Sequence, residues 1–132
     1  MAITRQYSAM KRTDTLGSIS YFPAKPSIDI SKLDHNNEFI LIIIACVKDF
    51  GGLILSNNSI QFTLPEIPSW LTVLNQTIVA DGKGFVTIKL SGKLSNSGSE
   101  GFTAVPFILS NEITPEIVRS GVISFIGTSK YL

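Results

Sequence analysis

The strongest constraint on the fold is the lack of a helical period. No window of about 11 residues or more repeats its apolar positions every 3.6 residues, as an amphipathic helix would. Short apolar segments alternate instead with clusters of Gly, Pro, Asn, Asp and Ser, which mark turns. Two-residue alternation is clear at 60–64 (IQFTL) and 85–90 (FVTIKL). About seven or eight such segments predict an antiparallel β-sandwich over residues 19–132.

The longest apolar run is residues 39–47 (FILIIIACV), which carries no charge. A membrane-spanning helix needs about 20 apolar residues, so this run is too short to cross a bilayer. Its isoleucine and valine content favours a central strand buried on both faces, although periodicity alone leaves a buried helix open. Cys46 is expected to pack inside it. We also expect these aromatic side chains in the core: Phe39, Phe62, Trp70, Phe85, Phe107 and Phe125.

Composition and charge exclude several classes of function. Hydrophobic residues make up 44% of the chain, which is enough for a core and too much for a disordered protein. Eleven Lys and Arg against ten Asp and Glu give a net charge of +1, so we expect no nucleic-acid or membrane partner. One cysteine cannot form a disulfide within the chain, and one cysteine with one histidine cannot build a Cys/His zinc site.

The sequence contains no recognisable catalytic constellation. A triad enzyme would need His35, the only histidine, but His35 lies in a polar turn and no serine nucleophile elbow is present. Asp34, Asn36 and Glu38 alternate like calcium ligands, yet the glycine and distal glutamate of an EF-hand loop are missing. An Asx turn explains these residues better. We therefore predict a protein that is not an enzyme, with no catalytic residues, metal or cofactor.

Residues 1–18 differ from the rest of the chain, because they are basic, proline-free and poor in large apolar side chains. We interpret them as an extended N-terminal arm, although a frayed terminus would give the same composition. Such an arm could add a strand to an open sheet edge of a neighbour. No apolar core of a secretion signal is visible, so we expect the protein to stay where it is made, or to leave by lysis or a specialised route. The candidate partner-binding residues of the arm are Ile3, Arg5, Tyr7, Met10, Lys11, Arg12 and Leu16.

Three short motifs resemble the second half of BACON-type immunoglobulin-like modules. They are residues 68–73 (PSWLTV), 84–88 (GFVTI) and 119–125 (RSGVISF), so the resemblance covers residues 68–126. The segment between Ser91 and Pro115 is longer than the family pattern. The resemblance implies an immunoglobulin-like sandwich in which Trp70 fills the gap between the sheets and the last alternating strand completes one of them.

The resemblance also implies two kinds of function. BACON modules occur in virion proteins of Bacteroides-infecting, crAss-like tailed phages, and in bacterial surface proteins for which carbohydrate binding has been proposed. We predict a virion structural or decoration protein, assembled in the host cytoplasm and docked through its N-terminal arm. Its partner would be the major capsid protein or another virion protein, with self-association and a head or tail location left open. The alternative is a carbohydrate-binding module that recognises a surface glycan and has no catalysis of its own.

Overall fold

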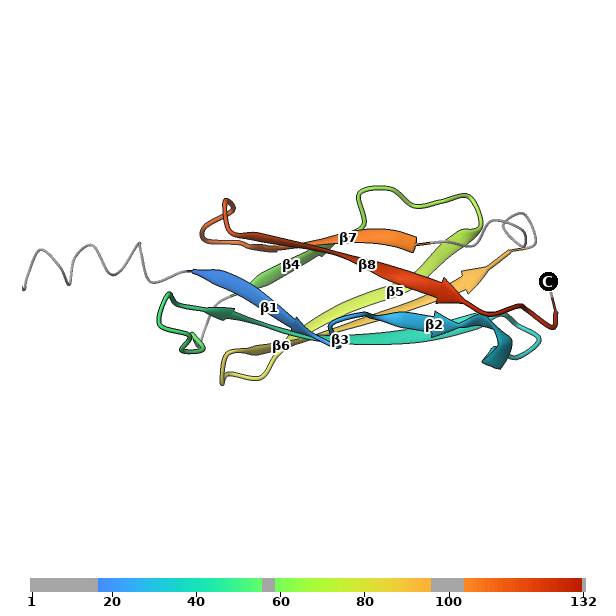
Figure 1. The fold of residues 1–132 in the computed structure, drawn as a ribbon, viewed down its shortest axis with the longest axis horizontal. Coiled ribbons are helices and arrows are strands. Elements are labelled where there is room, and N and C mark those ends of the chain that lie inside the picture. The colour runs from blue at the N-terminus through green and yellow to red at the C-terminus, as the bar shows by residue number, and fades with distance from the viewer. Residues whose placement is uncertain (1–16, 56–58, 96–103, 132) are drawn as a thin grey trace, which may run out of the picture.

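The computed structural model describes residues 17–55, 59–95 and 104–131. These residues form eight strands and one short 3-10 helix (Figure 1). In chain order the elements are β1 (Ser18–Phe22), β2 (Ser27–Asp29), η1 (Ile30–Lys32), β3 (Glu38–Lys48), β4 (Ile60–Thr63), β5 (Leu71–Ala80), β6 (Phe85–Leu94), β7 (Ala104–Asn111) and β8 (Val118–Ile126).

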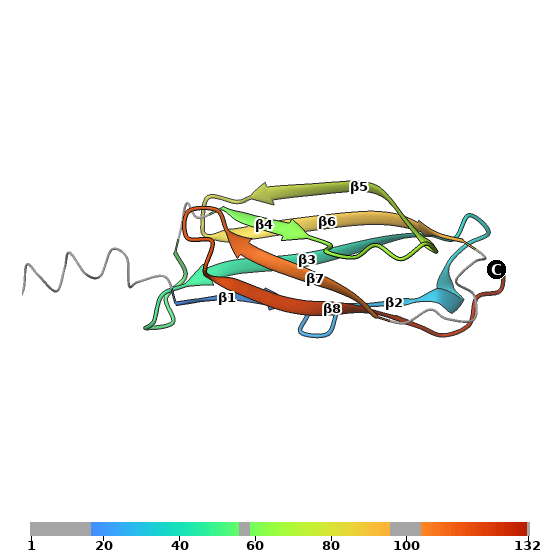
Figure 2. The same cartoon turned by 90° about the horizontal axis from the view of Figure 1, so that it is seen from above.

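The strands form two sheets of four, with the orders β1-β3-β6-β5 and β2-β8-β7-β4. Figure 2 shows the two layers from above, with β5 along one margin of the first sheet. An immunoglobulin constant-type domain likewise divides its strands into ABED and CFG sheets. Here β1, β3, β6 and β5 correspond to ABED, while β4, β7 and β8 correspond to CFG. The predicted immunoglobulin-like sandwich is confirmed.

The pairing is antiparallel except at one place. β2 runs parallel to β8, with Ile28 beside Phe125, so the expectation of a wholly antiparallel sandwich was wrong there. The reason lies between Pro23 and Pro26, where the chain leaves the first sheet and joins the second without reversing. β1 and β2 therefore point the same way, antiparallel to β3 in one sheet and parallel to β8 in the other.

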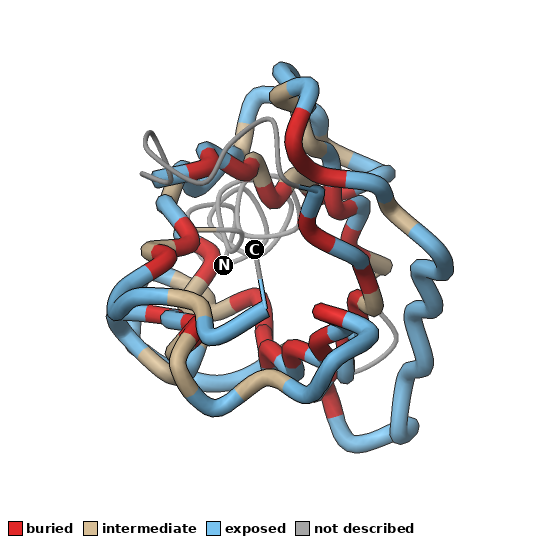
Figure 3. The backbone as a smooth tube through the Cα atoms, turned by 90° about the vertical axis from the view of Figure 1, so that its right-hand side faces the viewer, coloured by how far each residue is buried: buried red, intermediate tan, exposed pale blue. Residues whose placement is uncertain are grey.

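The core lies between the two sheets, and Figure 3 shows buried segments lining the space between the two layers. Trp70 is 8% exposed, and its ring meets Phe125 edge-on at 5.2 Å between centroids. Phe107 is fully buried, with Tyr21 edge-on to it and Phe62 stacked on it. The predicted place of Trp70 in the core is confirmed, and so is the burial of Phe39, Phe62, Phe107 and Phe125.

From Glu38 to Ala45 β3 is buried on one face only, so the prediction of a strand covered on both faces was wrong there, and only Cys46 is buried on the other face. Ile40, Ile42 and Ile44 are 61%, 50% and 40% exposed on the outer face, while Leu41 and Ile43 are buried. A two-layer sandwich covers each sheet on its inner side, and among the described residues no third layer covers β3. The central position of the strand between β1 and β6 was predicted correctly.

Phe85 was also expected in the core, but it is 38% exposed. β6 alternates as predicted, and the buried positions are Val86, Ile88 and Leu90. Thr87 and Lys89 are polar, so the same two-residue alternation places Phe85 on their face of β6, and the expectation that Phe85 is in the core overlooked this. Cys46 is 5% exposed, in agreement with the prediction that it packs inside the protein.

The proline in β7 is tolerated because one half of that strand has a single neighbour. β4 pairs only with Ile108–Asn111 of β7, so Pro106 lies beyond its end. Pro106 pairs with Val122 of β8 on the other side and is exposed. A residue without an N–H fits a position that has a strand neighbour on one side only.

Candidate protein-binding surface at the N-terminal pole

One end of the sandwich gathers the start of β1 and three loops. We call this end the N-terminal pole and define it by Gly17 and residues 49–55, 81–84 and 112–117. Figure 1 shows it at the end of the long axis where β1 begins, opposite the end marked C. The N–H of Gly17 donates to the carbonyl oxygen of Lys48 at 2.8 Å. Residues 1–16 therefore join the domain at this pole.

The loop of residues 49–55 is held by the carboxylate and backbone of Asp49. Its Oδ1 accepts from the N–H of Leu53 at 2.9 Å, and its own N–H donates to the carbonyl oxygen of Leu53 at 2.9 Å. Gly52 adopts a φ of 87°, which glycine reaches without strain. These bonds fix a tight loop that leaves Phe50 76% exposed and Leu53 70% exposed.

The loop of residues 112–117 is held in the same way by Asn111. The Oδ1 of Asn111 accepts from the N–H groups of Ile113 at 3.0 Å and Thr114 at 2.8 Å. Its Nδ2 donates to the carbonyl oxygen of Ser59 at 3.3 Å, across to the start of β4. Asn111 is 1% exposed, yet the loop that it organises leaves Ile113 70% exposed.

The turn of residues 81–84 completes the pole, and an Asx side chain that accepts backbone hydrogen bonds fixes this turn as well. The Oδ1 of Asp81 accepts from the N–H groups of Lys83 at 2.7 Å and Phe85 at 3.1 Å. The turn also packs on its neighbour, because a Cβ at Gly84 would lie 2.5 Å from the side chain of Ile54. Each of the three loops is thus fixed by an Asp or Asn at its start.

The apolar side chains at this pole have the character of a contact surface. Phe50, Leu53 and Ile113 are held out by hydrogen-bonded loops and are more than two-thirds exposed. Contiguous exposed apolar patches mark sites of interaction with other proteins, and these three side chains at one end of the sandwich make that end the candidate. None of the three was singled out from the sequence. The signal that could have found them is an Asx residue followed within four positions by a large apolar one (DFGGL at 49–53 and NEI at 111–113).

The partner-binding residues predicted from the sequence all lie outside the described residues. This applies to the whole set: Ile3, Arg5, Tyr7, Met10, Lys11, Arg12 and Leu16. Their proposed role stays a prediction. What the structure adds is the point at which their segment joins the sandwich, at Gly17 in the N-terminal pole.

A second feature lies at the opposite end of the sandwich, around the turn before β3. Asp34 Oδ1 accepts from the N–H of Asn36 at 2.9 Å, which confirms the predicted Asx turn. His35 is exposed there, with its ring edge-on to Tyr131 at 6.5 Å between centroids. The side-chain oxygen of Asn37 is buried and has no hydrogen-bond partner among the described residues. An open depression of about 410 Å³ at this turn is lined by His35, Asn36, Asn37, Thr72, Lys93, Leu94 and Ser95.

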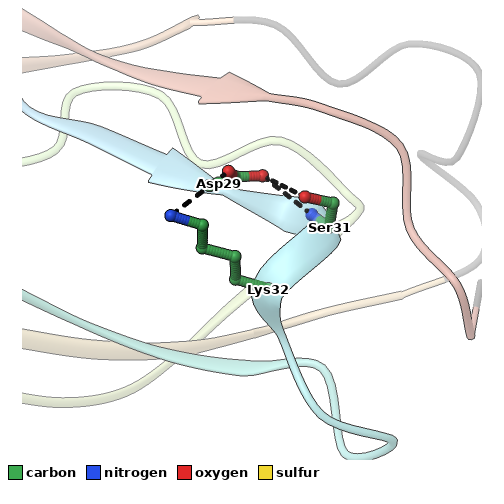
Figure 4. A network of polar contacts seen from close by, with 3 residues as sticks. All are labelled: Asp29, Ser31 and Lys32. Carbon is green, nitrogen blue, oxygen red and sulfur yellow. Dashed lines mark hydrogen bonds and ion pairs between the residues drawn. The ribbon is translucent and has the colours of Figure 1, made fainter.

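Just before this turn, a small polar network ends β2. Figure 4 shows Asp29 accepting hydrogen bonds from Ser31, through Oγ at 2.6 Å and through the backbone N–H at 3.1 Å. Lys32 Nζ lies 4.0 Å from the other carboxylate oxygen. The hydroxyl of Ser31 is the main cause that lowers the pKa of Asp29, with Lys32 adding to it. Asp29 acts as the N-cap of the 3-10 helix.

Within the described residues, no three His, Cys, Asp or Glu side chains are placed to hold a metal ion. The same part of the chain contains no helix of the length and hydrophobicity that crossing a membrane requires. Models of known protein families give no match to this chain, and a search of curated proteins gives none either. The resemblance of residues 68–126 to BACON modules thus stays a prediction from the motifs.

Proposed function

We propose that this chain is a structural protein without enzymatic activity, an auxiliary capsid-associated protein that decorates the virion of a tailed bacteriophage. The observation that carries the proposal is the N-terminal pole. There, two Asx-fixed loops leave Phe50, Leu53 and Ile113 exposed, at the end of the sandwich where Gly17 connects it to residues 1–16. Because residues 1–16 are joined to the same end of the domain as these apolar loops, the segment and the loops can bind one partner together.

In the proposed mode, residues 1–16 and the pole bind the same protein shell. The basic side chains Arg5, Lys11 and Arg12 pair with acidic groups of the major capsid protein or another virion protein. Phe50 and Leu53 fill apolar hollows beside them. Because a shell repeats the same contact many times, each copy can bind through a small area and still remain attached. The long axis of the sandwich leads away from the pole, so the remaining domain projects outward (Figure 1).

The motif resemblance supports the virion assignment. Trp70 is buried between the sheets, as the resemblance to BACON-type modules implies, and its ring contacts Phe125 of the last strand. Phage capsid and tail proteins are one of the two settings in which such modules occur. The other setting, bacterial surface proteins, is the source of the alternative function.

The test is binding of the purified full-length chain to particles of the phage that encodes it, measured by co-sedimentation. The double variant Phe50→Ser with Leu53→Ser should lose binding at least about tenfold, as expected for removal of two buried contacts. The matched control is Phe22→Ser, which removes a 71% exposed aromatic from the far end of β1. Deletion of residues 1–16 should also abolish binding. The proposal is overturned if the full-length protein does not bind the particles. It is also overturned if the double variant binds them as well as the original chain and the Phe22→Ser control do.

The second candidate function is recognition of a glycan at the opposite end. Two observations favour it. The buried side-chain oxygen of Asn37 lies in a polar depression and has no hydrogen-bond partner among the described residues, and Tyr131, beside His35, is 54% exposed. Sugar hydroxyls would satisfy the Asn37 oxygen, and an aromatic ring would stack on a pyranose face. Binding on a glycan array that Tyr131→Ala abolishes, with Phe50→Ser as the control, would establish this function in place of capsid decoration.

A further inference from the structure

β5 differs from the other strands at the margins of the two sheets. The margins are β1 and β5 in the first sheet, and β2 and β4 in the second. β1, β2 and β4 contain five, three and four residues, whereas β5 contains ten. Each short strand also adjoins a proline: Pro23 follows β1, Pro26 precedes β2, and Pro65 lies two residues after β4. Short edges and prolines are devices by which proteins prevent unwanted strand pairing.

The sequence of β5 carries none of these protections over most of its length. It reads LTVLNQTIVA, with no charge and no proline. Its one irregularity is a bulge between Val73 and Asn75, so the pairing with β6 is regular from Asn75 to Ala80. Val79 is 62% exposed and Ile78 39% exposed. A long, uncharged and regular edge is a template on which another strand can pair.

The backbone of β5 has free groups that face away from β6. The N–H of Asp81 donates to the carbonyl oxygen of Phe85 at 3.0 Å, so the backbone of residue 81 points toward β6. Backbone direction alternates along a strand. Gln76, Ile78 and Ala80 therefore point their N–H and C=O groups outward, where they have no strand partner among the described residues. The side chain of Gln76 turns inward instead and donates to the carbonyl oxygen of Phe62 at 3.1 Å.

We propose that β5 pairs with β5 of a second copy of this chain, antiparallel and about a two-fold axis at Ile78. Gln76 then lies opposite Ala80 of the second copy, and Ile78 lies opposite its own equivalent. Three such pairs, with two backbone hydrogen bonds in each, give about six hydrogen bonds. The two first sheets become one continuous sheet of eight strands, counted from two sheets of four. The interface is isologous, since the same residues face each other from both sides.

A second copy fits this edge better than a charged partner would. When two copies of one strand pair about a two-fold axis, a charged residue near the axis lies opposite or close to the same residue of the second copy. Like charges directly opposite each other destabilise a sheet. β5 contains no charge to oppose itself. The first charged residue after it, Asp81, would lie opposite Asn75. On the outer face, Thr77 would lie opposite Val79 of the second copy, which brings two β-branched side chains together. Residues 1–16 are the other segment of this chain that could pair with the edge. They are basic, and β5 contains no acidic residue that would attract them.

The register can be tested with paired charges at Thr77 and Val79, which both point outward and are exposed. In the double variant Thr77→Glu with Val79→Glu, each new glutamate lies opposite a glutamate of the second copy. In Thr77→Glu with Val79→Lys, each glutamate lies opposite a lysine. The change at Thr77 is the same in both, and within one chain Glu at this position would neighbour Lys89, its partner on β6. Any effect of that change on the monomer is therefore shared.

The measurement is sedimentation velocity of the full chain over a range of concentrations, with circular dichroism melts as the folding control. The original chain should form a dimer, and the Glu/Glu variant should raise the dissociation constant at least about tenfold. The Glu/Lys variant should dimerise as well as the original. A monomeric original chain overturns the proposal. Equal dissociation constants of the Glu/Glu and Glu/Lys variants would also overturn it. The same holds for a dimer that dissociates only when residues 1–16 are removed. The result does not depend on whether the chain binds virions.

Discussion

Replacing Asn111 with alanine tests whether one buried amide holds both a loop of the N-terminal pole and the start of β4. Asn111 is 1% exposed and makes three hydrogen bonds through its side chain. Two are short, at 3.0 and 2.8 Å to the N–H groups of Ile113 and Thr114. The third, from Nδ2 to Ser59, is longer at 3.3 Å.

The expected cost follows from these three bonds. A typical hydrogen bond contributes about 1 kcal/mol, so the two short bonds together contribute about 2 kcal/mol. The longer bond adds less than about 1 kcal/mol, while water replaces part of the loss because Ile113 and its loop are exposed. We expect Asn111→Ala to lower the free energy of unfolding by about 2–3 kcal/mol.

Urea denaturation of the full chain measures this value, and hydrogen exchange locates it. The amide protons of Ile113 and Thr114 should exchange faster in the variant, while those of β6 should change only with global stability. Asn111→Asp is the matched variant, since it keeps the accepting oxygen and loses the donor to Ser59. It should retain slow exchange at Ile113 and Thr114. A cost below about 0.5 kcal/mol, the range of ordinary surface substitutions, would refute the reasoning.

Three further predictions concern the core, the outer face and the polar network. Trp70→Ala should lower the free energy of unfolding by about 3–5 kcal/mol in urea denaturation, because the indole is buried. Ile43→Ala should cost about 2–5 kcal/mol and Ile42→Ala less than about 1 kcal/mol, since only Ile43 faces the core. Asp29 has a lowered pKa, so its contribution to stability is present above its ordinary value of 3.8 and is lost as the pH falls through the lower folded value. Ser31→Ala should therefore destabilise the protein at neutral pH, and the difference from the original chain should close under strongly acid conditions.

Much of the fold was predictable because local patterns and tertiary burial agree. The two-residue alternation of Val86, Ile88 and Leu90 marks the inner face of β6, and the Asp81–Gly84 turn before it joins two antiparallel strands. Trp70 was predictable because a large aromatic after a proline turn has few places outside a core. In each case, one short stretch of sequence contains enough information to decide.

The outer face was not predictable, because its residues look the same as those of the core. Ile40, Ile42 and Ile44 alternate with Leu41 and Ile43, so all five positions are apolar and no polar residue marks the exposed side. A strand of a parallel sheet, covered on both sides by helices, has the same sequence pattern. Whether such a strand is covered on one face or on both depends on the number of layers in the whole domain. The sequence of a single strand does not contain that information.

The N-terminal pole depends on a different kind of information, the direction of successive strands. β3, β5 and β7 all run toward the same end, since each is followed by a strand that runs back. The connections after them therefore meet at one pole, and β1 begins there because it is antiparallel to β3, with Ser18 beside Lys48. An Asp or Asn at the end of each of these strands then fixes a loop at the same pole, although Asp49 and Asn111 are far apart in the sequence. Once the strand order is known, the connections that contain an Asx residue followed by a large apolar one are seen to lie at the same pole, and they predict the contact surface. Each of these turns alone predicts only that the chain reverses.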